Sequence, residues 1–416
     1  MAWGLGGLLN HEQRAEFSKA LLPELRIVCK QLESLPSSAT IYDITPDVTT
    51  LKLTTYDALV PKYAFESGLT VTNMFVPTLR TAANLHVLQT IAQGGYGVLL
   101  SGKPGTGKSA YLQQCTRALG TSQTYCKMSL GQRTTTDDVE DFVLSRFVKR
   151  HRRSLGPPYG SRMLFLIDNI AVPIPDQFGA RRPHQLLRQI VEYGGFFERA
   201  RFQFIHVEDT STILSGATEV AGVATDMRLL RHFNILFQDD YAPADIRYIF
   251  TQILRGAWEY SLPTLSNYAE VMIDATVAAY ERIKGHLLPT PLKCHYTFTV
   301  REVSRALEVM LMADTSKIAT QVDIARRLWL HEMQRQFVDR LISIEDRKWT
   351  ERVLLKQISA SLDLKDELED CVCSQIIFGD FAEIGSGKNY SEISISEEEM
   401  NVILSRYALR NRGLLF

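Results

Sequence analysis

Short apolar runs and longer amphipathic segments alternate along the first part of this chain of 416 residues. The runs have the length and the side chains typical of buried β-strands, and the segments between them repeat apolar residues every three or four positions, as helices do. Strands that alternate with helices predict a parallel sheet covered by helices, which is an α/β fold. The runs that predict the strands of this sheet are 98–101, 124–128, 163–168, 202–207 and 234–237.

Beyond Ala242 the pattern becomes helical, with a period of about 3.6 residues that Pro289 and Pro291 interrupt. The helices predicted there are 245–256, 267–284, 300–312 and 322–343, and an earlier amphipathic helix is predicted over 11–30. We therefore expect three regions along the chain. They are an adapter over 1–56, a large α/β domain over 57–240 and a smaller helical domain over 241–416.

The composition is that of an ordinary globular protein, with 45% hydrophobic and 22% charged residues. A formal net charge of −1 argues against a general electrostatic affinity for nucleic acid or for an anionic membrane. The run Lys149-Arg150-His151-Arg152-Arg153 is a local exception. We interpret it as a solvated helix end or loop, with contact to a polyanion as the alternative. We therefore expect neither nucleic acid nor a membrane among the partners.

The cysteines and the amino terminus bear on cellular location. The six cysteines lack the spacing of a zinc site and are typical of free thiols in a reducing compartment. The first residues have no basic region, and their apolar stretch is too short for a signal peptide. No apolar run approaches the roughly 20 residues that a membrane helix needs. A cytoplasmic or cytoskeletal protein is expected.

The strongest chemical motif follows the first predicted strand, where residues 102–109 match the phosphate loop G-x-x-x-x-G-K-[ST] in full. Glycines lack a Cβ, so backbone N–H groups can turn toward phosphate oxygens, and the helix that begins near Gly107 adds the positive end of its dipole. Lys108 would reach the β- and γ-phosphates, and Ser109 would ligate Mg²⁺. The residues expected to bind ATP or ADP are Gly102, Lys103, Pro104, Gly105, Thr106, Gly107, Lys108 and Ser109.

A second signature is the apolar run 163–167, which ends in Asp168. A carboxylate in this position after a phosphate loop is typical of the Walker B acid, which orders Mg²⁺. The next residue is Asn169, where AAA+ ATPases usually have a glutamate that acts as general base for the attacking water. An amide orients water but accepts no proton, so we expect slow hydrolysis or none. The alternative is that Asn169 is only a turn residue after the strand.

Nearly the whole chain resembles one family, the dynein heavy chains, and within them the third AAA+ module of the motor ring. The resemblance is carried by segments 165–173, 176–179 and 183–189, with further matches at 41–43, 76–78, 231–236, 288–291, 295–298, 327–332, 339–341 and 377–381. The segments after Pro289 resemble axonemal more than cytoplasmic dyneins. A dynein heavy chain is many times longer than this chain, which resembles the end of the second module followed by the third.

The resemblance implies an AAA+ P-loop core, with a parallel five-stranded sheet flanked by helices, followed by an α-helical lid domain. It implies that Asp168 is the Walker B acid and that Arg301 is the sensor-2 arginine, which contacts the γ-phosphate from the lid. Arg231 matches an arginine finger directed at the nucleotide of the preceding module. The planar charged fork of arginine suits both tasks, although either residue alone would be interpreted as a surface ion pair. Residues 208–213, after the predicted fourth strand, lack the family's sensor-1 asparagine.

The function implied by the resemblance is that of an ATP-binding regulatory module of a dynein motor, with weak or absent hydrolysis at its own site. Nucleotide state would bias how the large domain and the lid pack together. Neighbouring AAA+ modules would be the partners, and microtubules and other dynein subunits would be reached only through the full heavy chain. The location would be the cytoskeleton of a cilium or flagellum. The alternatives are a stand-alone P-loop ATPase or kinase, and a non-catalytic scaffold fragment that holds ATP.

Overall fold

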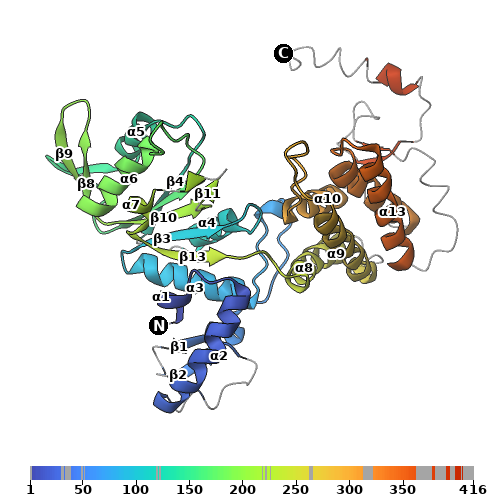
Figure 1. Ribbon diagram of the computed structural model, residues 1–416, viewed down its shortest axis with the longest axis horizontal. Helices are drawn as coiled ribbons and strands as arrows, with labels where there is room; N and C mark the ends of the chain where they lie inside the picture. Colours follow the sequence, from blue (N-terminus) through green and yellow to red (C-terminus); the bar gives the residue numbers. More distant parts are fainter. Residues whose placement is uncertain are drawn as a thin grey trace. The chain divides into compact units, whose positions relative to one another are not determined.

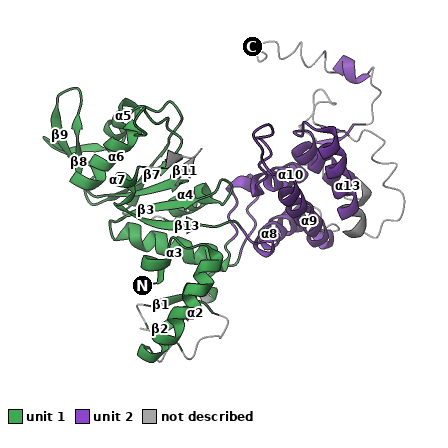
Figure 2. Ribbon diagram, viewed as in Figure 1, with its two compact units in different colours: residues 1–62, 77–240 green, residues 63–76, 241–416 purple. Residues whose placement is uncertain are grey.

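The structure is a computed structural model in which the chain forms two compact units (Figure 2). Unit 1 comprises Met1–Lys62 and Pro77–Asp240, and unit 2 comprises Tyr63–Val76 and Tyr241–Phe416. The residues that the structure describes are 2–29, 32, 39–47, 50, 52–118, 120, 123–217, 219–220, 223–224, 226–261, 266–312, 322–361, 377–379, 390–393, 399–403 and 405.

A five-stranded parallel sheet forms the centre of unit 1 (Figure 1), which confirms the predicted fold class. Its strands in chain order are β3 (Gly97–Gly102), β4 (Gln123–Ser129), β7 (Arg162–Asp168), β10 (Thr210–Gly216) and β13 (Phe233–Gln238). Their order in space is β13-β3-β10-β7-β4, so β3 lies between β13 and β10. The register pairs Ser129 with Asp168, which brings the carboxyl ends of β4 and β7 to the same level.

Helices cover both faces of this sheet. One face packs against α3 (Leu79–Gln93) and α4 (Lys108–Arg117). The other packs against α5 (Thr136–Arg146), α6 (Arg182–Tyr193) and α7 (Met227–Leu230). Side chains alternate along a strand, so β7 contributes Phe165 to the core beneath α5 and α6 and Leu166 to the core beneath α4. Burial on both faces explains why β3 and β7 are largely apolar runs in the sequence.

The prediction for the fourth strand of this sheet is wrong. Residues 202–207 correspond to β9 (Gln203–Val207), which belongs to a second sheet, whereas the fourth central strand is β10. β10 begins with three hydroxyl residues, so its sequence pattern resembles that of a polar loop although most of the strand is buried. Two of them, Ser211 and Thr212, are buried, and Ser211 Oγ donates to the carbonyl oxygen of Ala92 at 2.8 Å. A hydroxyl that finds such an acceptor can lie in a core.

The second sheet has four strands in the order β5-β6-β9-β8. Its other strands are β5 (Val148–His151), β6 (Ser154–Gly156) and β8 (Gly195–Glu198). β5 and β6 form one hairpin, β8 and β9 form another, and β6 runs parallel to β9. The basic run 149–153 therefore lies on a strand and its turn rather than at a helix end. A short pair, β11 (Glu219–Val220) with β12 (Val223–Ala224), follows β10.

The first residues of the chain lie along the edge of the central sheet. They form α1 (Ala2–Gly6), α2 (His11–Val28), β1 (Ile44–Asp47), β2 (Lys52–Thr55) and the 3₁₀ turn η2 (Tyr56–Leu59). The backbone N–H of Phe237 on β13 donates to the carbonyl oxygen of Gly7 at 2.9 Å. Arg14 on α2 donates to the carbonyl oxygens of both residues. These bonds cover the edge strand β13, whose backbone groups would otherwise be unpaired.

Unit 2 is built mainly of helices, as the sequence predicts. Its elements are η3 (Val71–Asn73), α8 (Pro243–Ser261), η4 (Ser266–Tyr268), α9 (Ala269–His286), α10 (Val300–Met312), α12 (Val322–Met333), the π-helical turn η5 (Gln334–Val338), α13 (Ile344–Ser361), β14 (Phe378–Gly379) and β15 (Ser391–Glu392). A single helix over 322–343 is a wrong prediction, because α12 passes into the π turn and α13 begins separately at Ile344. Among the described residues, no helix is long and apolar enough to cross a membrane.

Candidate nucleotide site

The predicted phosphate loop joins β3 to α4 at the carboxyl end of the central sheet. Gly105 and Gly107 have φ angles of 85° and 79°, in the left-handed region that glycine adopts without steric cost. Gly102 is needed for another reason, because a Cβ at this position would lie 2.3 Å from the carbonyl oxygen of Gln238 on β13. Backbone geometry and close packing thus explain all three glycines of the motif.

Lys108 begins α4 and turns its side chain back over the loop. Its Nζ donates to the carbonyl oxygens of Gly102 at 2.8 Å and Lys103 at 2.5 Å, and to Thr106 Oγ1 at 3.3 Å. A phosphate oxygen would be a stronger, charge-assisted acceptor than these neutral oxygens. The other lysine of the loop, Lys103, is 71% exposed at its side chain and pairs with Asp240 at 3.5 Å.

Ser109 and Asp168 meet at the predicted Mg²⁺ position. Ser109 Oγ donates to Asp168 Oδ2 at 2.8 Å, and Asp168 is only 8% exposed at the end of β7. A hydroxyl and a carboxylate oxygen are the hard ligands that Mg²⁺ prefers, and both stand beside the phosphate loop. The structure therefore brings the two predicted metal ligands together.

Asn169 is held in place beside these ligands. Its Nδ2 donates to Ser129 Oγ at 2.9 Å, and its backbone N–H donates to Asp168 Oδ1 at 3.0 Å. Its φ of 61° lies in the left-handed region, which asparagine tolerates better than most residues with a side chain. Ser129 was not predicted as a site residue. Its position at the end of β4, level with Asp168, is a property of the sheet register rather than of a local motif.

The loop that follows Asp168 is fixed to the start of α6 by two buried side chains that the sequence did not reveal. His184 is fully buried, and its Nε2 donates to the carbonyl oxygen of Ile170 at 2.7 Å. Arg181 is 2% exposed, and its Nε donates to the carbonyl oxygen of Pro173 at 3.0 Å. Burial lowers the pKa of His184 to about 4. The imidazole is therefore neutral at neutral pH, with its proton on Nε2.

The end of the fourth strand differs from the prediction because β10 was not recognised. Residues 208–213 do not follow that strand but include its first half, so their composition says nothing about a sensor-1 side chain. The register pairs Leu214 with Ile167, and Ser215 and Asp168 come next on the two strands. Ser215 is fully buried, and its Oγ has no hydrogen-bond partner among the described residues. Ser215 is thus the polar side chain that β10 brings to the level of Asp168.

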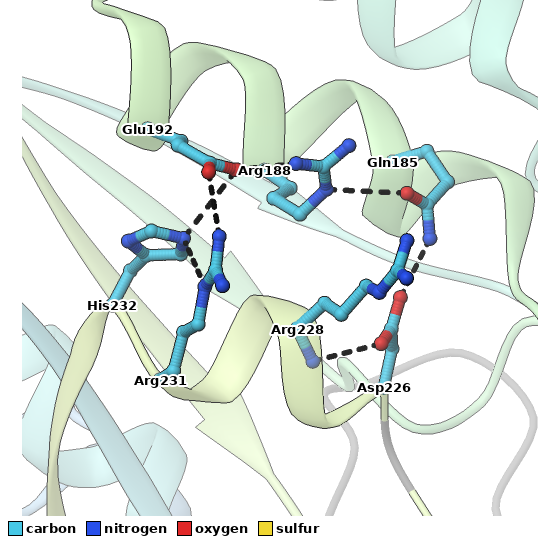
Figure 3. A network of polar contacts seen from close by, with 7 residues as sticks. All are labelled: Gln185, Arg188, Glu192, Asp226, Arg228, Arg231 and His232. Atoms are coloured by element: carbon cyan, nitrogen blue, oxygen red, sulfur yellow. Dashed lines mark hydrogen bonds and ion pairs between the residues drawn. The ribbon is translucent and has the colours of Figure 1, made fainter.

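Arg231, the predicted finger, belongs to a network that joins α6 to the end of α7 (Figure 3). Its Nη2 pairs with Glu192 Oε1 at 2.5 Å, and Glu192 also pairs with Arg188 on its own helix. Burial alone would raise the pKa of the Glu192 carboxyl, but the hydrogen bond from Arg188 and the charge of Arg231 lower it. The Arg231 side chain stays 56% exposed. The guanidinium is thus held by an acidic residue yet reachable from solvent.

A second contact in this network fixes the start of α7. Asp226 caps the helix by accepting from the backbone N–H of Arg228 at 2.9 Å, and it accepts from Gln185 Nε2 at 2.6 Å. Gln185 lies on α6, as Glu192 does. The short helix that ends at Arg231 is therefore fastened to α6 at both of its ends.

Arg301, the predicted sensor-2 arginine, lies in unit 2 on the first turn of α10. Its side chain is exposed, and its backbone N–H donates to Thr299 Oγ1 at 3.3 Å. Glu302, the next residue, accepts from the N–H and from the hydroxyl of Thr299, both at 2.8 Å. These contacts define where the helix begins and leave the Arg301 guanidinium on its outer side.

The residues of unit 1 fit a nucleoside triphosphate with Mg²⁺. The loop supplies left-handed glycines and a lysine whose present acceptors are weaker than phosphate, and Ser109 with Asp168 supplies oxygen ligands. A P-loop with these partners is the standard arrangement for binding the β- and γ-phosphates. The site therefore fits nucleotide binding, and it has an amide where a catalytic carboxylate would stand.

Comparison with family models matches both units of the chain to dyneins. Residues 63–241 match the model described as the P-loop containing dynein motor region. Residues 249–347 match the model described as the dynein heavy chain ATPase lid domain.

Among curated proteins, human dynein axonemal heavy chain 1 is 32% identical over 351 residues, which are 80% of this chain and 8% of that protein. Human dynein axonemal heavy chain 6 is 28% identical over 98% of this chain and 10% of its own length. Mouse dynein axonemal heavy chain 2 is 26% identical over 98% of this chain and 9% of its own length. The chain thus spans about a tenth of the length of these relatives. It contains an AAA+ dynein motor region followed by a dynein lid domain, and it is homologous to axonemal dynein heavy chains.

Proposed function

We propose that this chain acts as the third AAA+ module of a dynein heavy chain, which binds ATP or ADP with Mg²⁺ and hydrolyses ATP slowly or not at all. The observation that supports this most directly is the arrangement at the carboxyl ends of β4 and β7. Ser109 and Asp168 lie together as metal ligands, while the adjacent position is Asn169, which is hydrogen-bonded to Ser129. Groups that could bind the nucleotide are present, and the side chain directly after Asp168 is an amide, which cannot act as a general base.

In this proposal each group of the site has a separate task. Lys108 exchanges the loop carbonyl oxygens for phosphate oxygens, and Ser109 and Asp168 hold the metal. ATP, when bound, supplies the γ-phosphate whose presence or absence distinguishes the two nucleotide states. Asn169 can orient a water molecule, but its amide cannot take up the proton that hydrolysis releases.

The two arginines act on phosphates from different sides in this proposal. Arg301 contacts the nucleotide of its own module from the lid, and Arg231 contacts that of a preceding module. The exposed Arg231 guanidinium supports the second role, since it could exchange Glu192 for a phosphate at a module boundary. Neighbouring AAA+ modules are thus the expected partners. The axonemal names of the relatives favour a cytoskeletal location in a cilium or flagellum.

The experiment that tests the proposal is nucleotide binding by the purified chain with Mg²⁺, followed with a fluorescent ATP analogue. Lys108→Ala should weaken binding by about 100-fold, because a charge-assisted phosphate contact at a desolvated loop is lost. Lys103→Ala is the matched control. Lys103 is expected to contribute its backbone N–H to the phosphate loop, while its exposed side chain pairs with Asp240. Removing that side chain should therefore change the affinity by less than about threefold.

Equal affinity of the wild type and Lys108→Ala would overturn the assignment of the site. Steady-state turnover serves as the second measurement. Rapid multiple turnover by the wild-type chain that Asp168→Ala abolishes would favour a stand-alone ATPase over a regulatory module.

A further inference from the structure

The second sheet of unit 1 ends in two turns that lie on the same side. β6 and β9 run parallel, and each strand directly follows its turn, at 152–153 and 199–202. Both turns are therefore at one end of the sheet. The register pairs Ser154 with His206, so β9 begins beyond the start of β6, and the β8–β9 hairpin projects from the body of unit 1 (Figure 1).

Four basic side chains lie near this end of the sheet. Lys149, Arg152, Arg153 and Arg201 are exposed, and none of them forms an ion pair with any residue of the described ranges. Their neighbours differ from them, because Arg150 is bound by Asp209 and Arg199 by Glu140. The chain as a whole has a net charge of −1, so this is a local excess of positive charge. Such a surface attracts an anionic partner.

Two exposed aromatic side chains belong to the same hairpin as Arg201. Phe197 on β8 is 57% exposed, and Phe202 in the turn is 84% exposed. Phe202 also has a φ of 52°, a left-handed conformation in which glycine or asparagine would be less strained. The turn thus keeps a large apolar side chain in water at a backbone cost. An interface that buries this side chain would compensate for the exposed apolar surface and for the strained backbone.

We propose that Arg152, Arg153, Arg201, Phe197 and Phe202, which we call the hairpin-end surface, bind an acidic protein segment that also carries apolar side chains. The arginines would pair with its carboxylates, and the phenylalanines would receive its apolar residues. A single-stranded nucleic acid would need open aromatic faces for its bases to stack upon. Of the two phenylalanines, Phe202 has an open ring, whereas Phe197 packs against Phe204 in a T-shaped pair with centroids 5.1 Å apart. One open ring cannot stack a run of bases, which favours a protein partner.

The proposal is tested with the full chain and a fluorescein-labelled synthetic peptide of repeated Glu-Glu-Leu, whose binding is followed by fluorescence anisotropy at low ionic strength. Replacing Arg152, Arg153 and Arg201 together by glutamate should raise the Kd by about tenfold or more, because three attractive charges become repulsive. The matched control replaces Lys19, Arg26 and Lys52, which are exposed cations of the amino-terminal elements, and should change the Kd by less than about twofold.

Phe202→Gly separates recognition from folding. Glycine relieves the left-handed backbone, so the midpoint of thermal unfolding should stay the same or rise, while the Kd should rise by about fivefold. Equal effects of the two charge reversals, or none from either, would overturn the proposal. So would binding of a single-stranded oligonucleotide that is tighter than that of the peptide and is lost in the Arg152, Arg153 and Arg201 variant.

Discussion

At the scale of residues, the position after Asp168, the proposed Walker B acid, is the one at which the proposed lack of hydrolysis can be tested. Asn169 lies beside Ser109 and Asp168, the proposed metal ligands, donates to Ser129 and has a left-handed backbone. Aspartate has the same shape as asparagine and tolerates the same backbone, so it would add a proton acceptor and change little else. The Ser129 hydroxyl could then donate a hydrogen bond to that carboxylate, whereas it now accepts one from the Asn169 amide.

We therefore expect Asn169→Asp to raise the rate of ATP turnover by about 100-fold, the lower range of what a general base contributes. The affinity for ATP should change by less than about threefold, because the phosphate contacts are unaltered. Single-turnover hydrolysis of radiolabelled ATP measures the first quantity. Asn169→Ala is the control, since it removes the amide without adding a base. An Asn169→Asp variant as slow as Asn169→Ala would show that another group limits hydrolysis.

The site residues that the sequence predicts share one property, which is that a contiguous motif identifies them. Residues 102–109 form a loop whose chemistry is fixed by their spacing, and Asp168 ends an apolar run. Ser129, Arg181 and His184 belong to the same region but have no motif, because strand pairing and helix packing bring them there. A contiguous motif can be recognised in the sequence, whereas residues that come together from distant segments can be recognised only once the fold is known.

At the scale of elements, the loop after β7 depends on its attachment to α6. His184 is neutral and buried, with a pKa lowered by burial to about 4, against an ordinary value of 6.5. An unfolded chain would take up a proton on this imidazole below pH 6.5, whereas the folded chain would not until near pH 4. Stability from the neutral imidazole is therefore complete above pH 6.5 and is lost as the pH falls toward 4.

This predicts that the free energy of unfolding falls by about 2 kcal/mol between pH 7 and pH 5 through His184 alone. Urea unfolding at several pH values measures the decline. His184→Gln removes the titrating group and should flatten the curve by that amount, even though the substitution lowers stability at neutral pH. Carboxylates titrate in both proteins and cancel in the comparison. Parallel curves for the two proteins would contradict the prediction.

Element prediction from the pattern succeeds where a strand is buried on both faces and fails where polarity and burial disagree. β3 and β7 are continuous apolar runs, so their positions follow from the sequence. β10 begins with hydroxyl residues whose burial depends on acceptors such as the carbonyl of Ala92. β9 is a short strand of mixed apolar and polar residues, which fits a strand of either sheet. The choice between the two sheets depends on pairing partners, which no local pattern records.

At the scale of the whole molecule, the chain passes between its two units more than once. Residues 63–76 precede the large domain in sequence, and the matched dynein motor region begins at residue 63, yet these residues belong to unit 2. Val71 and Val76 are 5% and 4% exposed in the core that the helices of unit 2 form. Gly256 on α8 accommodates the same segment, because a Cβ there would lie 2.8 Å from the Cβ of Phe65. A lid that begins at residue 241 would thus lack part of its own core.

The integrity of unit 2 should therefore depend on a segment that precedes unit 1 in the chain. Val76→Ala leaves a cavity in the core of unit 2 and should cost about 2 kcal/mol, which lowers the unfolding midpoint of that unit by roughly 4–8 °C. Trp258, Trp329 and Trp349 lie in unit 2, so tryptophan fluorescence mainly reports its unfolding. Val87→Ala is the matched control, because Val87 is 9% exposed in the core of unit 1 and its loss should leave the fluorescence transition in place. If Val87→Ala lowers the midpoint of the fluorescence transition and Val76→Ala does not, residues 63–76 do not belong to the core of unit 2.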